Sequence, residues 1–153
     1  SDRRRIVGVD YDAEKIETAR HSFLRRPETE FVHADLRTAE LPEADAFLLL
    51  DVLHYMQPEE QRGLIARCAA RLKAGGRIII RDGDAGKAER HKTTAMTEVW
   101  STKIVGFNKT DGELHFTSTP ELQQTARRLG LEIHAAHTDA HTSNTVYILT
   151  RPE

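Results

Sequence analysis

Short apolar runs alternate with longer amphipathic stretches along this 153-residue chain. Each apolar run is four to six residues long and is rich in β-branched residues or leucine, as in strands. The run 46–50 is continuously apolar, so we expect helices to cover this strand on both faces. The pattern predicts strands over 5–9, 30–33, 46–50, 77–80, 131–135 and 145–150.

Three stretches carry apolar residues at helical spacing. Pro27 ends the first and Pro58 opens the second, where a missing N–H costs nothing. Glycines at 75–76 and 130 end the second and third, and Thr119 is expected to cap the third. These signals predict helices over 12–25, 58–74 and 119–129.

The order of these elements defines the fold class. Short strands separated by amphipathic helices are typical of an α/β protein with a mostly parallel twisted sheet flanked by helices. The last two strands are joined by residues 136–144, a connection too short for a helical crossover. We therefore expect one domain over 1–153 with an antiparallel pair of strands at its C-terminal end.

A long segment at about 83–117 breaks this rhythm, and an insertion of this length indicates a functional role. We interpret it as a lid-like insertion. The dipeptide Asp111-Gly112 predicts a hairpin that would set Phe107 opposite Phe116. The insertion also carries large apolar residues on or near one helical face: Met96, Val99, Trp100, Ile104 and Phe107.

Composition excludes several classes of protein. With 39% hydrophobic and 30% charged residues the chain is that of an ordinary folded protein, and its net charge of -2 indicates neither a nucleic-acid nor a membrane partner. Cys68 is the sole cysteine, which favours a cytoplasmic location. We predict no metal site, because His134, His137 and His141 span a strand and a loop.

Acidic residues follow three of the predicted strands. In parallel α/β sheets, ligands bind at the carboxyl ends of strands, and Asp10, Asp35 and Asp51 stand there. A carboxylate after a strand can accept hydrogen bonds from both hydroxyls of a ribose, and a second acid can meet an adenine amino group. Aspartates at strand ends also serve turns, so the set carries more weight than any single member.

Five segments together resemble consecutive blocks of class I S-adenosylmethionine (SAM)-dependent methyltransferases. The resemblance lies in their order, their spacing and their placement at strand ends, over roughly residues 6–150. It implies a Rossmann-like fold and SAM as cofactor, with S-adenosylhomocysteine (SAH) as product. The blocks are IVGVDYDAEKIETAR (6–20), FVHADLR (31–37), DAFLLLDVLHYM (45–56), LKAGGRIIIRD (72–82) and TSTPELQQTARRLGLEIH (117–134).

The resemblance implies roles for residues at the strand ends. Asp10 would hold the ribose hydroxyls of SAM, and Tyr11 would pack near the adenine. Asp35 would accept a hydrogen bond from the adenine amino group, with Leu36 against the ring. The remaining implied cofactor contacts are Asp51 and Val52, near the reactive end of SAM.

The turn that follows, Leu53–Tyr55, is expected to face the methyl acceptor, a small molecule. His54 is the best candidate for a general base, which helps when the acceptor is a hydroxyl. A histidine in this turn is also compatible with a structural or substrate-shaping role. The expected substrate contacts are Leu53, Tyr55, Trp100, His115 and Phe116.

The chain departs from the family at its start. The family opens with a strand and a glycine-rich turn that leads into a helix, and only residues 1–4 precede the first predicted strand here. That strand normally lies between the strands ending at Asp10 and Asp51. The sequence leaves three alternatives open: the chain is a fragment, another chain fills the gap, or the two strands pair directly. Bare strand edges also predict self-association.

Three functions are compatible with the sequence. The first is methyl transfer from SAM to an oxygen, nitrogen or carbon atom of a small molecule, incomplete in this chain. The second is a non-catalytic module that kept the fold and lost the cofactor. The third is a nicotinamide-dependent dehydrogenase, because Asp10 after a strand suits that cofactor too, but the Asp35 and Asp51 blocks and the final strands favour the methyltransferase.

Overall fold

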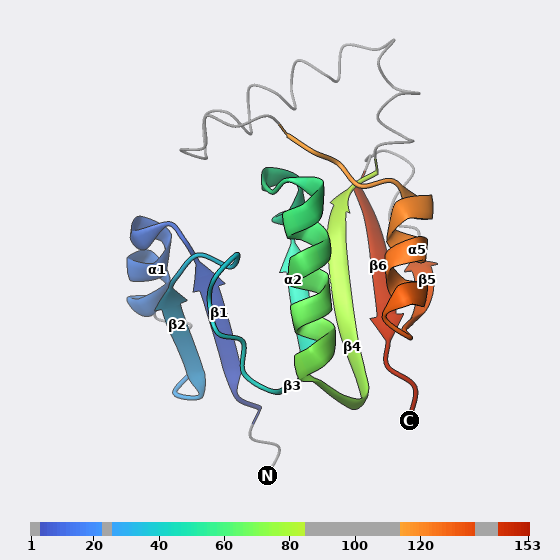
Figure 1. The fold of residues 1–153 in the computed structure, drawn as a ribbon. Helices are drawn as coiled ribbons and strands as arrows, with labels where there is room; N and C mark the ends of the chain where they lie inside the picture. Colours follow the sequence, from blue (N-terminus) through green and yellow to red (C-terminus); the bar gives the residue numbers. More distant parts are fainter. Residues whose placement is uncertain (1–3, 23–25, 85–113, 137–143) are drawn as a thin grey trace. The chain divides into compact units, whose positions relative to one another are not determined.

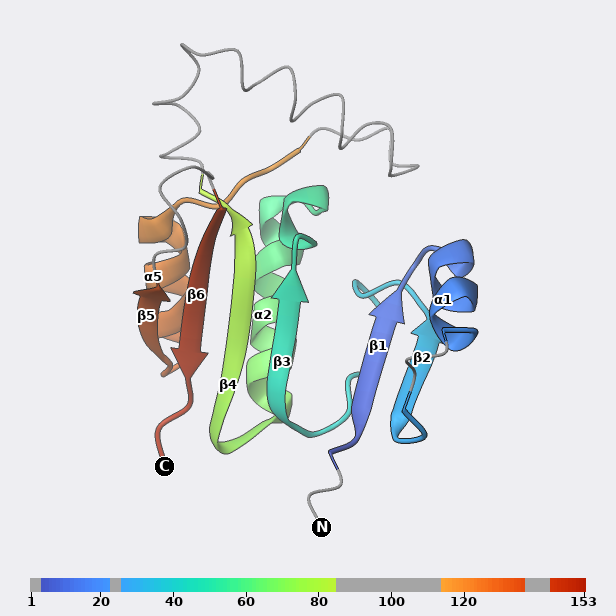
Figure 2. The same ribbon diagram turned by 180° about the vertical axis from the view of Figure 1, so that it is seen from behind.

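The computed structural model describes residues 4–22, 26–84, 114–136 and 144–153. They form two compact units, Ser1–Glu40 and Leu41–Glu153, each with its own sheet. Figures 1 and 2 show the elements from opposite sides. Most of the expected lid-like insertion at about 83–117, including the hairpin at Asp111-Gly112, lies outside the described residues.

The first unit is a β-α-β element. β1 (Ile6–Asp10) and β2 (Thr29–His33) are parallel neighbours, and α1 (Ala13–Arg20) connects them. The carboxylate of Asp12 caps α1 by accepting from the N–H groups of Glu14 and Lys15. Gly8 allows the ring of Phe31 to approach β1, because a Cβ at this position would lie 2.9 Å from Cδ1 of Phe31. The strands predicted at 5–9 and 30–33 are therefore confirmed to within one residue.

The helix expected over 12–25 ends earlier, at Arg20. The backbone N–H of Ser22 bonds to the carbonyl of Ala19, which tightens the chain out of α-helical geometry. Nδ1 of His21 also lies 2.9 Å from the carbonyl oxygen of Glu17, so a side chain caps the last turn. Local hydrogen bonds thus end α1 well before Pro27.

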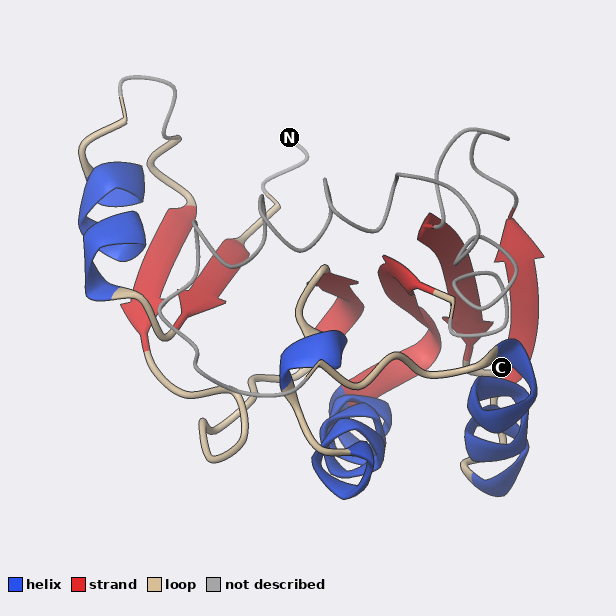
Figure 3. Cartoon of the chain, turned by 90° about the horizontal axis from the view of Figure 1, so that it is seen from above, coloured by secondary structure: helices blue, strands red, loops and turns tan. Residues whose placement is uncertain are grey.

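The second unit is a four-stranded sheet with the order β3-β4-β6-β5. β3 and β4 are parallel, whereas β4 with β6 and β6 with β5 are antiparallel, as expected for the last two strands. Figure 3 shows α2 and α5 on the same side of this sheet. The elements are β3 (Ala44–Leu50), η1 (Leu53–Tyr55), α2 (Pro58–Arg71), β4 (Leu72–Gly83), α5 (Thr119–Arg128), β5 (Glu132–Ala136) and β6 (Asn144–Thr150).

The core of this unit lies between the sheet and the two helices. Along β4, Ile78, Ile80 and Asp82 are buried, while Arg77 before them and Arg81 between Ile80 and Asp82 are exposed. Burying each such aliphatic side chain contributes about 1.5–3 kcal/mol, and this burial holds α2 and α5 on the sheet. The other partners include Leu64, Ile65, Cys68, Leu122, Ala126 and Leu149.

The second face of this sheet differs from the expectation for strand 46–50. Leu48 and Leu50 are 60% and 48% exposed, whereas Leu49 between them is 5% exposed. Successive side chains of a strand point to opposite faces, so α2 and α5 cover the Leu49 face alone. Within the described residues, helices cover β3 on one face.

Two element boundaries in this unit also differ from the expectation. α2 ends at Arg71, and β4 begins directly at Leu72, with Gly75 and Gly76 inside it. Gly75 has φ +68, a conformation that favours glycine, so it turns the chain within β4 and does not end the helix. At α5, Ser118 and not Thr119 is the N-cap, in a capping box with Glu121.

Among the described residues, each of the two units has an edge strand that concerns the expected gap. β1 pairs with β2, and β3 pairs with β4, so β1 and β3 are each an edge strand with one partner. No helix in the described part of the chain has the length and hydropathy required to cross a membrane.

Candidate functional site

A buried histidine–carboxylate pair occupies the carboxyl ends of β3 and β4. Nδ1 of His54 lies 2.5 Å from Oδ1 of Asp82, and the two side chains are 2% and 9% exposed. β3 and β4 are adjacent parallel strands with Leu50 opposite Arg81, so the residues just beyond meet at one edge of the sheet. The pair therefore stands where an α/β sheet binds its ligands.

The carboxylate of Asp82 is held by several donors. Its Oδ2 accepts from the backbone N–H of His54 at 3.1 Å, and its Oδ1 accepts from the N–H of Gly83 at 2.8 Å. A carboxylate can only accept, so Nδ1 of His54 carries the proton in the contact with Asp82. The other ring nitrogen, Nε2, then has a lone pair, and it is buried without a hydrogen-bond partner among the described residues. An imidazole in this state can accept a proton at Nε2.

Aromatic residues surround the imidazole of His54. The ring of Phe116 stacks on it with centroids 5.2 Å apart and an interplanar angle of 28°. The ring of Tyr55 is tilted by 49° with its centroid 4.1 Å away. The N–H of His115 donates to the carbonyl of His54 at 2.9 Å. The structure thus brings together four of the residues expected near the acceptor.

Asp51 ends β3 in an unusual backbone conformation. Its φ of 53° lies in the left-handed region, which aspartate tolerates better than most residues. Its N–H bonds to the carbonyl of Arg81, and its carboxylate forms an ion pair with the guanidinium of Arg81. The hydrogen bond to Asp51 raises the pKa of Arg81. Val52 and Leu53 follow, with Leu53 buried.

In the first unit, Asp10 is the last residue of β1. Its Oδ1 accepts from the N–H of Asp12 at 2.8 Å, which orients the carboxylate at the strand end. Oδ2 of Asp10 has no hydrogen bond among the described residues. Tyr11 is 46% exposed, and its carbonyl accepts from Nε2 of His33 at 2.8 Å. A carboxylate oxygen without a partner among the described residues, next to an exposed tyrosine in the chain, suits a ribose and an adenine.

Asp35 follows β2 and binds an arginine. The guanidinium of Arg37 donates to both carboxylate oxygens of Asp35, at 2.7 Å and 2.9 Å to Oδ2 and 3.0 Å to Oδ1. The Arg37 N–H also donates to Oδ1 of Asp35, so the acid organises its own turn. Leu36, between them, is half-buried. The adenine roles of Asp35 and Leu36 stay predictions.

The sequence reasoning missed two residues of this site. Asp82 follows the strand predicted over 77–80, but its pairing with His54 cannot be predicted without the strand order. Gln61 lies within the predicted helix 58–74, and its buried amide donates to the carbonyl of Met56, just after the His54 turn, and to the carbonyl of His115. Trp100, expected to contact the acceptor, lies outside the described residues.

A second polar cluster lies where β4 leaves the sheet. Oδ2 of Asp84 accepts from the hydroxyl of Thr119 at 2.6 Å and from the hydroxyl of Tyr147 at 3.1 Å. The two hydroxyls lie 2.8 Å apart. Burial, followed by the charge of Asp84, raises the pKa of Tyr147. The cluster joins the end of β4 to the start of α5 and to β6.

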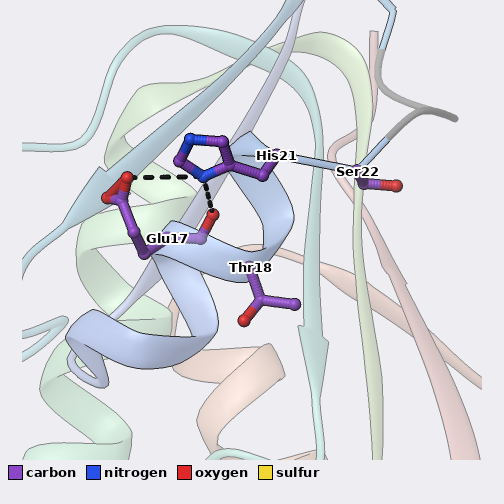
Figure 4. Close-up of a pocket in the computed structure, with 4 residues that line it drawn as sticks. All are labelled: Glu17, Thr18, His21 and Ser22. Atoms are coloured by element: carbon purple, nitrogen blue, oxygen red, sulfur yellow. Dashed lines mark hydrogen bonds and ion pairs between the residues drawn. The ribbon is translucent and has the colours of Figure 1, made fainter.

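Two other features carry no chemistry in this structure. A hollow against α1 is lined by Glu17, Thr18, His21 and Ser22 (Figure 4). The Glu17 and His21 side chains are 58% and 77% exposed, so the hollow is open surface. The described residues hold no group of three or more His, Cys, Asp or Glu side chains placed for a metal ion; the expected strand-and-loop set includes His137 and His141, which are not described.

Comparison with known proteins assigns the chain to a family. The model of a family described as an O-methyltransferase domain matches residues 6–116, well over half of the chain. The chain belongs to the O-methyltransferase domain family. The predicted resemblance to SAM-dependent methyltransferases is therefore confirmed. A search of curated protein sequences finds no match to this O-methyltransferase domain.

Solved structures agree with this family. An O-methyltransferase family protein from Burkholderia thailandensis is 28% identical, with a TM-score of 0.61, over 82% of this chain and 36% of that one. Human N-acetylserotonin methyltransferase in complex with SAM is 19% identical, with a TM-score of 0.69, over 97% of this chain and 41% of that one. Magnesium protoporphyrin IX methyltransferase from Synechocystis PCC 6803 with bound SAH is 17% identical, with a TM-score of 0.65, over 95% of this chain and 63% of that one.

Two facts follow for this O-methyltransferase domain. Its fold is the Rossmann-like α/β fold of SAM-dependent methyltransferases, as predicted. It spans 36% and 41% of the length of the first two proteins, so it corresponds to part of each of them. Family and fold also favour the methyltransferase over the nicotinamide-dependent dehydrogenase.

Proposed function

We propose that the protein carrying this chain transfers the methyl group of SAM to a hydroxyl oxygen of a small molecule. The observation that carries the proposal is His54: Nδ1 is fixed by Asp82, and Nε2 is buried and without a partner among the described residues. Such an imidazole can act as a general base. The family description, an O-methyltransferase domain, supports an oxygen acceptor.

In the proposed reaction, the acceptor oxygen forms a bond to the methyl carbon as the bond between that carbon and the sulfur of SAM breaks, and SAH leaves. Nε2 of His54 takes the proton of the acceptor hydroxyl. The proton ends on Nε2, and the carboxylate of Asp82 stabilises the resulting imidazolium through Nδ1–H. The rings of Phe116 and Tyr55 keep water from the imidazole and provide an apolar surface for the acceptor.

SAM, when bound, supplies the electrophilic methyl group. The residues of the first unit fit its nucleoside end, because Asp10 has an oxygen without a partner in the described residues and Tyr11 exposes its ring. Asp51 is proposed to line the cofactor near its reactive end, with its carboxylate oriented by Arg81. Two of the solved relatives were crystallised with SAM or SAH, which supports this cofactor.

The test is methyl transfer from labelled SAM by the full-length protein to a panel of phenols and aliphatic alcohols. We expect His54→Gln to lower the rate by about 10²- to 10⁴-fold, the usual contribution of a general base, with SAH binding retained. His134→Gln, an exposed histidine on β5, is the matched control and should be active. A His54→Gln variant with the wild-type rate would refute the proposal.

The alternative, a non-catalytic binding or regulatory module, makes the opposite prediction. A full-length protein that binds neither SAM nor SAH in calorimetry, and transfers no methyl group, would support it. The buried Nε2 of His54, without a partner among the described residues, favours catalysis. An unpaired polar atom in a core lowers stability, and a catalytic role explains why it is kept.

We also propose that the chain self-associates through strand edges. β1 and β3 each leave one edge without a partner among the described residues, and such edges template pairing with another chain. Light scattering of the isolated chain tests this, and a strictly monomeric species would refute it. A cytoplasmic location stays a prediction from the single cysteine.

A further inference from the structure

Gln61 is a buried amide in a helix face whose other buried residues are apolar or small. It is 3% exposed, in the first turns of α2. Its Nε2 donates to the carbonyl of Met56 at 3.0 Å and to the carbonyl of His115 at 2.6 Å. Its Oε1 accepts from the hydroxyl of Thr117. One side chain therefore joins the end of η1, α2 and the segment 115–117.

The segment that Gln61 holds runs beside the proposed base. Phe116 stands directly between His115 and Thr117, and its ring stacks on the imidazole of His54. The N–H of His115 donates to the carbonyl of His54 at 2.9 Å, which sets the register of the segment against η1. The place of Phe116 thus depends on bonds made on both sides of it.

We infer that Gln61 is a positioning residue for His54, acting through Phe116. The imidazole is restrained at Nδ1 by Asp82 and on one face by the ring of Phe116. If the amide of Gln61 is lost, the carbonyl of His115 and the hydroxyl of Thr117 lose this partner. The bond from the N–H of His115 to the carbonyl of His54 remains, so the segment is held beside His54 with fewer restraints on Phe116. The inference rests on the proposed function, in which the direction of Nε2 matters.

A purely structural amide would stabilise the fold without affecting the imidazole, so the test observes the imidazole itself. We would record ¹H–¹⁵N spectra of the full-length, SAH-loaded protein with ¹⁵N-labelled histidine. In the wild type we expect a slowly exchanging proton on Nδ1 of His54 and none on Nε2. Gln61→Leu removes the three hydrogen bonds of the amide. Because the net loss of a single buried hydrogen bond corresponds to about tenfold, we expect exchange of that proton to be at least about tenfold faster.

The controls separate positioning from general damage. Phe116→Leu should move the ring-proton shifts of His54 by removing the stacked ring, and Gln61→Leu should move them in the same direction. Gln124→Leu, at an exposed glutamine of α5, should leave both exchange and shifts unchanged. Wild-type exchange and shifts in Gln61→Leu, beside altered ones in Phe116→Leu, would overturn the inference.

A milder variant covers the case in which Gln61→Leu does not fold. Thr117→Val removes a single bond to Gln61 and keeps the shape of the side chain. We therefore expect smaller changes, in the same direction, in the exchange of the Nδ1 proton and in the ring-proton shifts of His54. His54 signals identical to the wild type in Thr117→Val would then overturn the inference. A proton on Nε2 instead of Nδ1 in the wild type would refute the proposed base itself, whatever the Gln61 variants do.

Discussion

The Nδ1 atom of His54 and the Oδ1 atom of Asp82 lie 2.5 Å apart, although the residues are 28 positions apart in the chain. β3 delivers the histidine just past its end, and β4 delivers the acid at its own end. The parallel register, with Leu50 opposite Arg81, brings the two ends together. The two remaining donors to Asp82, the N–H groups of His54 and Gly83, keep the carboxylate in place.

Replacing this carboxylate should impair methyl transfer more than folding. Asp82→Asn keeps the size of the side chain but removes the charge that stabilises an imidazolium and can favour the wrong tautomer of His54. We expect a rate reduced by about 10²- to 10⁴-fold, measured with labelled SAM and an accepted alcohol or phenol. Asp45→Asn, an exposed acid that pairs with Lys73, is the control and should be unaffected. Full activity in Asp82→Asn would contradict the assigned role.

Cofactor affinity should depend on Asp10. Asp10→Asn keeps an oxygen for the N–H of Asp12 and removes the charge from the outward atom, so the turn survives. Hydrogen bonds to a charged group contribute about 1.5–3 kcal/mol, which predicts SAH binding weaker by roughly 10- to 100-fold in calorimetry. Glu30→Ala, an exposed acid on β2, should bind as the wild type. An unchanged dissociation constant in Asp10→Asn would remove Asp10 from the cofactor site.

Tyr147 should make stability depend on alkaline pH. Burial raises its pKa above 10.0 in the folded state, so the phenol favours folding while it is protonated. That contribution is complete below about pH 10 and is lost as the pH rises through the folded-state pKa. We expect the free energy of unfolding of the wild type to fall more steeply above pH 10 than that of Tyr147→Phe, in urea titrations.

The same variant tests the cluster around Asp84 near neutral pH. Tyr147→Phe removes one of the two hydroxyl donors to Asp84 and leaves that of Thr119. The lost hydrogen bond should lower the free energy of unfolding by about 1–3 kcal/mol. Tyr11→Phe, at an exposed tyrosine outside this cluster, serves as the comparison. Equal stability of Tyr147→Phe and the wild type at both pH values would contradict the account.

The capping box of α5 predicts the opposite pH dependence. Hydrogen bonds from Ser118 lower the pKa of Glu121 below 4.5, so the ionised acid favours the folded state. This contribution is present above about pH 4.5 and is lost as the pH falls through the lowered pKa. Ser118→Ala should cost about 1 kcal/mol in urea unfolding at pH 7.

Acid should then erase the difference between Ser118→Ala and the wild type. We expect their unfolding free energies to converge as the pH falls from 5 toward the folded-state pKa. Glu43→Gln, which neutralises an exposed acid outside the box, should show no such convergence. A gap that stays constant with pH would mean that the box contributes through geometry alone.

Much of the fold could be predicted from the chain because its signals are local. Pro58 at the start of α2 and Gly130 after α5 mark boundaries through backbone chemistry that acts within a few residues. The apolar run ending at Leu50 marks a strand by composition alone. Where a boundary was wrong, as at Arg20, hydrogen bonds within one turn decided it against a hydrophobic pattern that continued further.

Part of the candidate site could also be predicted from local signals in the sequence. His54 and Asp10 could be proposed because the carboxyl end of a strand is a position that the sequence shows. Asp82 and Gln61 could not be paired with His54, because their contacts join β4, α2 and the segment 115–117 across long separations.

By itself, therefore, the sequence determined the order of strands and helices, the family resemblance and the acids at strand ends, since each depends on neighbours in the chain. The tertiary structure alone decided which acid meets His54, that Asp51 turns to Arg81, and that Nε2 of His54 is buried without a partner among the described residues. Those facts depend on the register of β3 against β4 and on side-chain packing, which long-range contacts set.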